Sequence, residues 1–95
     1  MVMDTAYEVR VRKEVLLEAY AGVLVRFLDY FEKKHVDPLS SLGDGNAFLY
    51  LQAVDICRNL VDVKSLEKIV EAEGQFKLLR RVANRLNGYP VDAPV

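Results

Sequence analysis

The sequence predicts an all-α protein, a small helical bundle of three main helices at about residues 5–35, 46–61 and 63–87. Apolar residues recur at alternating spacings of three and four along most of the chain, which is the period of an α-helix. Proline and glycine residues, which end helices, mark a connection at residues 36–45 and the end of the third helix near residue 88. A chain of 95 residues accommodates one domain, so residues 1–95 are expected to form a single helical domain.

The stretch from Lys13 to Lys34 has the clearest helical period. Two adjacent apolar series run along it and make an apolar surface wider than the roughly 100° that faces one core. The first series consists of Leu17, Ala21, Leu24, Leu28 and Phe31, and the second of Leu16, Tyr20, Val23, Phe27 and Tyr30. This helix is therefore expected to pack against two partners and to form the axis of the bundle.

Residues 5–12 allow two interpretations. Thr5 and Glu8 have the spacing of a capping box, which favours an N-terminal extension of the long helix. Tyr7, Val9 and Val11 alternate with charged residues, which is a strand pattern. A single strand in a helical chain could pair only with the same strand of a second copy. We favour the helix and keep the dimer-pairing strand as the alternative.

The second helix is bounded by residues typical of helix ends. Pro38 ends the preceding helix, and Asp44 or Asn46 can cap the next one. The pattern predicts that this second helix continues to about Val61 and is apolar on more than one side.

The third helix is expected to run from about Val63 to Asn87 without a break at Gly74, because its apolar spacing keeps one phase. That series is Ile69, Ala72, Phe76, Leu79, Ala83 and Leu86. Gly88 suits the position after a helix, and residues 88–95 are expected to form a loose C-terminal tail.

The apolar content indicates a further buried surface. Hydrophobic residues make up 52% of the chain before glycine is counted, against a usual ~45–50% with glycine included. We therefore expect a homo-oligomer or a complex with another helical protein. Gly22 would allow a close helix crossing, and the predicted interface comprises Gly22, Leu17, Ala21, Leu24, Leu28 and Phe31.

The alternative to a protein-interaction module is a nucleic-acid-binding protein that uses the basic face of the third helix. This face consists of Lys77, Arg80, Arg81 and Arg85. Against Asp92 alone, these four residues give residues 75–95 a net charge of +3. The whole chain has a net charge of −1, and an electrostatic footprint for nucleic acid usually extends beyond one helix. The sequence therefore does not favour this alternative.

The sequence offers little for catalysis or for metal or cofactor binding. Glu32 and His35 have the spacing of a metal-binding pair on a helix, but His35 is the only histidine and suits a helix end. Cys57 is the only cysteine and lies among apolar residues, which predicts a buried structural role or an interchain disulfide at a dimer axis. We predict no catalytic residues, no metal and no cofactor.

No apolar run reaches the ~18 residues of a membrane span, and a lone cysteine is typical of a reducing compartment. The sequence thus predicts a cytoplasmic, non-enzymatic helical module with no membrane partner. It would act in protein interaction or oligomerisation, or as a small subunit of a larger complex.

Overall fold

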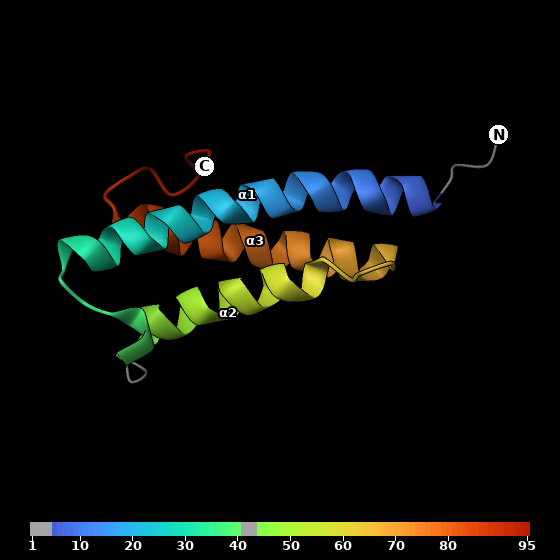
Figure 1. Cartoon of the computed structure of the whole chain (residues 1–95). Coiled ribbons are helices and arrows are strands. Elements are labelled where there is room, and N and C mark those ends of the chain that lie inside the picture. Colours follow the sequence, from blue (N-terminus) through green and yellow to red (C-terminus); the bar gives the residue numbers. More distant parts are fainter. Residues whose placement is uncertain (1–4, 41–43) are drawn as a thin grey trace.

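The computed structural model describes residues 5–40 and 44–95. Three α-helices and one short 3₁₀-helix form it: α1 (Thr5–Lys33), η1 (Pro38–Ser40), α2 (Gly45–Leu60) and α3 (Leu66–Leu86). α1 and α3 run in the same direction, and α2 runs in the opposite direction beside them (Figure 1). No strand occurs in the described ranges, so the all-α prediction is confirmed. The bundle is elongated, 53 × 27 × 15 Å, because the 29 residues of α1 span about 43 Å.

Residues 5–12 form the first turns of α1, as the helix interpretation predicted. Val9 lies in the core, whereas Tyr7 and Val11 lie on the exposed side of the same helix. Glu8 accepts a hydrogen bond from Nη1 of Arg12, one turn later, at 3.1 Å. The dimer-pairing strand was therefore wrong, and the alternation of apolar and charged residues arises from a helix with apolar residues on two sides.

α1 ends in a Schellman motif that is centred on His35. This residue has φ of 56°, the left-handed conformation that closes many helices. The backbone N–H of His35 donates to the carbonyl of Glu32 at 3.1 Å, and that of Val36 donates to the carbonyl of Phe31 at 3.0 Å. Val36 also packs against the core, which adds the apolar contact that accompanies this motif. His35 thus has a backbone role at the helix end.

The core lies along the line where the three helices meet. α1 contributes Val9, Leu16, Tyr20, Val23, Phe27 and Phe31, α2 contributes Ala47, Ala53 and Leu60, and α3 contributes Ile69, Ala72, Leu79 and Ala83. Phe27 and Phe31 pack edge-on against Tyr50, with ring centroids 6.2 and 5.8 Å apart. α1 therefore has the two helical partners that its wide apolar surface predicted, and both belong to its own chain. None of the helices in the described part of the chain is long and apolar enough to cross a membrane.

The ends of α2 and α3 follow their capping chemistry. The side chain of Asp44 accepts a hydrogen bond from the backbone N–H of Asn46 at 2.8 Å, so Asp44 is the N-cap of α2. α3 continues through Gly74, as its apolar phase predicted. It begins at Leu66 rather than near residue 63, because the extended backbone of Ser65 precedes its first turn.

The segment 88–95, expected to be a loose tail, is held against α1 and α3. It turns back from the end of α3 and runs along the middle of α1 (Figure 1). Nδ2 of the buried Asn84 donates to the carbonyls of Val91 and Ala93, each at 2.9 Å. Arg26 donates to the carbonyl of Pro94 at 2.6 Å. The structure differs from the expectation because Asn84 turns its polar side chain inward, where it meets the backbone of this segment.

Candidate functional site

The outer face of α1 carries apolar side chains that neither α2 nor α3 covers. Val15 is 65% exposed and Val25 is 56% exposed, and Tyr7, Val11 and Leu28 are exposed as well. Acidic residues share this face, namely Glu14, Glu18 and Asp29. Exposed apolar side chains that gather on one face of a helix can mark a protein-binding surface. The outer face of α1, defined by these eight residues, is therefore a candidate protein-binding surface.

The interface residues predicted from the sequence do not share one free face. Phe31 lies in the core beside Tyr50, and Leu17 and Leu24 are half-buried against the same core. Ala21 and Leu28 are exposed. The sequence showed two apolar series on α1, but it could not show which one α2 and α3 would cover.

Gly22, the predicted close crossing, lies beneath the last residue of the chain. A Cβ atom placed on Gly22 would stand 3.0 Å from Cβ of Val95, which is closer than ordinary packing allows. The small residue therefore admits the chain's own C-terminal segment at this point of α1. Val15 and Val25 were not part of the interface predicted from the sequence, although both side chains are exposed. Their place on the α1 face opposite the second apolar series is the signal that would have found them.

A groove of about 460 Å³ runs between the N-terminal half of α1 and the middle of α3. Its apolar lining includes Val11, Val15, Ala19 and Phe76, and its charged lining includes Lys77 and Arg80. Arg80 holds its guanidinium carbon 5.5 Å from the centroid of the Phe76 ring, a cation–π contact. Nε of Arg80 is buried and has no hydrogen-bond partner within residues 5–40 and 44–95.

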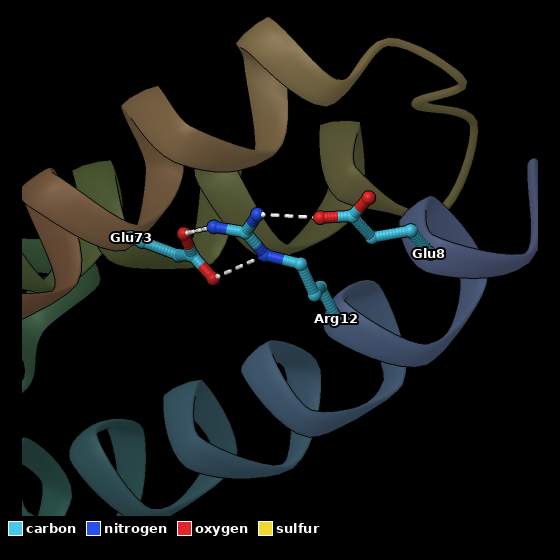
Figure 2. A network of polar contacts seen from close by, with 3 residues as sticks. All are labelled: Glu8, Arg12 and Glu73. Atoms are coloured by element: carbon cyan, nitrogen blue, oxygen red, sulfur yellow. Dashed lines mark hydrogen bonds and ion pairs between the residues drawn. The ribbon is translucent and has the colours of Figure 1, made fainter. Parts of the chain in front are cut away.

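One end of this groove is closed by an ion network that joins α1 to α3. Figure 2 shows the guanidinium of Arg12 between the carboxylates of Glu8 and Glu73. Nε of Arg12 donates to Oε2 of Glu73 at 3.2 Å, and Nη2 donates to Oε1 of the same carboxylate. These hydrogen bonds, which Arg12 donates to Glu73 and, with a smaller effect, to Glu8, raise the pKa of Arg12 further above its already high value. Arg12 therefore remains charged and joins α1 to α3 through Glu73, which lies 61 residues later in the sequence.

Three of the four basic residues of α3, Lys77, Arg80 and Arg81, line one pocket together with Asp92. Nε of Arg81 donates to the carboxylate of Asp92 at 3.2 Å, which attaches the C-terminal segment to α3. Lys77 and Arg80 also line the groove beside α1. Arg85 is exposed in the last turn of α3. The structure therefore brings three of the four predicted residues together, with the carboxylate of Asp92 among them.

The remaining candidates are possible metal ligands, the thiol of Cys57 and the buried hydroxyl of Tyr20. The described residues contain no cluster of three or more histidine, cysteine, aspartate or glutamate side chains that could hold a metal ion. Cys57 is half-buried, and burial raises the pKa of its thiol, which lowers the fraction of reactive thiolate at neutral pH. The hydroxyl of Tyr20 donates to the carbonyl of Ala72 at 2.8 Å inside the core.

Comparison with known protein families identifies residues 5–86 as a match to the family described as bacterial epsilon antitoxin. The chain belongs to the bacterial epsilon antitoxin family. The match begins at the first residue of α1 and ends at the last residue of α3, so it includes all three helices. No curated protein and no solved structure matches the chain. Membership in the epsilon antitoxin family is consistent with the predicted class, a small protein-binding module.

Proposed function

We propose that this chain is a non-enzymatic antitoxin, which binds a protein toxin and keeps it inactive. The observation that carries the proposal is the family match, because it extends over the whole helical bundle. An antitoxin of this kind acts through a binding surface and needs no reactive centre of its own. The exposed apolar side chains of α1 support this proposal, because they can provide such a surface.

The outer face of α1 is the surface that we assign to the toxin. Val15 and Val25 offer apolar area that is exposed in the single chain, and Glu14, Glu18 and Asp29 surround it with negative charge. Burying apolar side chains gives a complex its affinity, and complementary charges speed the encounter. We therefore expect the toxin to present an apolar surface with basic residues around it.

A genetic experiment tests the function whatever the identity of the toxin. Deletion of the gene in its native bacterium should arrest growth, because the toxin would be left unopposed, and the wild-type chain should restore growth. Tagged chain from the same cells should retain one protein partner in a stable complex. Normal growth of the deletion strain, together with the absence of any stable partner, would overturn the proposal.

A pair of valine substitutions tests the surface. Val25→Asp should weaken binding to the captured toxin about tenfold or more, because it places a charge where apolar contact forms, on a residue that does not line the groove between α1 and α3. Val70→Asp is the matched control, since Val70 is 52% exposed but lies on α3. The control should bind the toxin as the wild type does, and circular dichroism should show both variants folded. Equal toxin binding by the two variants would remove the outer face of α1 from the interface.

We also propose that the chain self-associates and that it meets its toxin in the cytoplasm. The excess of apolar residues and the exposed face of α1 support an assembly larger than one chain. Sedimentation at tens of micromolar should show a mass above that of the single chain. A strict monomer at that concentration would contradict self-association and would leave toxin binding as a separate question.

A further inference from the structure

The C-terminal segment shows what kind of ligand the space between α1 and α3 accepts. It is a non-helical stretch with a turn from Pro90 to Ala93. Its carboxylate at Asp92 pairs with Arg81, and its apolar side chain at Val95 packs on Gly22. Part of this space is thus filled by a short segment that combines one carboxylate with apolar side chains.

The groove lies about one helical turn away from the C-terminal segment, toward the first residues of α1. Ala19 and Arg80 line the groove, and they lie about one turn before Gly22 and Asn84, which hold the segment. The lining repeats the same chemistry, because Val15 and Phe76 are apolar and Lys77 and Arg80 are cationic. At the far end, Arg12 and Glu73 close the groove.

We infer that this groove binds a short segment of the partner protein that carries an apolar side chain and a carboxylate. The apolar side chain would lie over Val15 and Ala19, in contact with the ring of Phe76. The carboxylate would accept hydrogen bonds from the guanidinium of Arg80 and the ammonium of Lys77. This inference rests on the proposed function, because the segment belongs to the bound toxin.

Arg80 is the residue on which the inference depends most. Its buried Nε lacks an acceptor among the described residues, and a buried donor without a partner is unfavourable. Turning the guanidinium from its place over the Phe76 ring toward an incoming carboxylate would supply that acceptor. Arg81, one residue later, already makes such a contact with Asp92.

Two substitutions isolate the groove. Arg80→Met removes the charge and the unpartnered Nε and keeps an unbranched apolar side chain at this position, so the fold should be retained. Ala19→Glu places a carboxylate in the groove, where it can pair with Arg80 and block the site. Arg58→Met is the matched control, because Arg58 is exposed on α2, away from the groove.

The first measurement is a selection of short random displayed peptides on the full-length chain. Enriched peptides should combine Asp or Glu with apolar residues, and they should bind Arg80→Met and Ala19→Glu about tenfold more weakly than Arg58→Met or the wild type. The inference would be overturned if no peptide is enriched, if acidic residues are not enriched, or if the selected peptides bind all variants equally.

The second measurement uses the captured toxin and separates this inference from the proposed function. Weaker toxin binding by both groove variants, with unchanged binding by Arg58→Met, supports the inference. Toxin binding that is equal in all variants overturns the groove and leaves the antitoxin function standing. If the groove variants instead lose only self-association, the occupant is a second copy of this chain, and the inference is wrong.

Discussion

Tyr20 is a core residue of α1, and its side-chain hydroxyl forms a hydrogen bond to α3. Its hydroxyl donates to the carbonyl of Ala72, and the ring packs edge-on against Phe76 at 5.4 Å. Tyr20→Phe keeps the ring contact and removes the hydrogen bond. We expect the free energy of unfolding in urea to fall by about 1 kcal/mol, the usual net value of such a bond. An unchanged free energy of unfolding would contradict this expectation. It would mean that the bond between the Tyr20 hydroxyl and the Ala72 carbonyl is no stronger than the hydrogen bonds that both groups make to water in the unfolded chain.

The same residue makes the protein less stable at high pH. Burial, and to a smaller extent the nearby Cys57, raises the pKa of Tyr20. In the unfolded chain the phenol would ionise near pH 10, so above that pH the folded state holds one more proton at this site. The free energy of unfolding should then fall by at most about 1.4 kcal/mol per pH unit from this group. Tyr20→Phe should lack that part of the slope, and equal slopes would contradict the assignment.

Asn84 is the residue that attaches the C-terminal segment to the bundle. It is fully buried, its Nδ2 donates to two carbonyls of the segment, and its Oδ1 accepts from Arg26. Asn84→Asp replaces the donor with an oxygen that repels both carbonyls, although the contact with Arg26 can remain. Residues 91–95 should then exchange amide hydrogens faster and be cleaved faster by carboxypeptidase, with a stability loss of about 1–3 kcal/mol. Asn59→Asp, on the exposed side of α2, is the control and should leave the segment as protected as in the wild type.

At the scale of the helices, the two N-caps differ in a way that can be measured. Asp44 accepts a hydrogen bond from the first turn of α2, whereas the side chain of Ser65 makes no capping bond to α3. Asp44→Ala should therefore reduce the free energy of unfolding by about 1 kcal/mol, and Ser65→Ala should reduce it by less. Thermal melts followed by circular dichroism compare the two variants directly. A larger loss from Ser65→Ala would mean that Ser65 caps α3 in solution.

The helices were predictable because their signal is repeated many times along the chain. The phase of the apolar series through Gly74 predicted one continuous α3. The sequence offered Asp44 or Asn46 as the cap of α2, and the structure has Asp44 in that position. The position of the C-terminal segment depends on single contacts instead. The segment is held by single residues, Asn84 in α3 and Gly22 under Val95, and single residues give no periodic pattern. The sequence therefore could not reveal that the segment packs against the bundle.

The sequence predicted that α1 carries a binding surface, but not which residues form it. A wide apolar surface on α1 indicated a binding partner, but half of the residues that the prediction chose, Leu17, Leu24 and Phe31, pack into the core of the bundle. Which side of α1 remains open depends on how the other two helices pack, and that is a property of the whole bundle. Val15 and Val25 became candidates only when the arrangement of the three helices was known.

At the scale of the whole molecule, the Arg12–Glu73 pair joins the N-terminal half of α1 to α3, where the two helices enclose the groove. Glu73 receives two hydrogen bonds from Arg12 and belongs to another helix, whereas Glu8 receives one and lies a single turn away (Figure 2). Glu73→Gln should therefore increase amide exchange in the first turns of α1 more than Glu8→Gln does.

A double-mutant cycle with Arg12→Met and Glu73→Gln measures the coupling between the two residues in urea unfolding. The coupling should be favourable at low salt and should shrink as salt is added, because both side chains are partly open to solvent. A coupling that does not change with salt would mean that packing of the Arg12 stem, rather than charge, holds α1 against α3. The groove at this end would then keep its shape without the ion pair, and Arg12→Met alone should leave amide exchange in α1 unchanged.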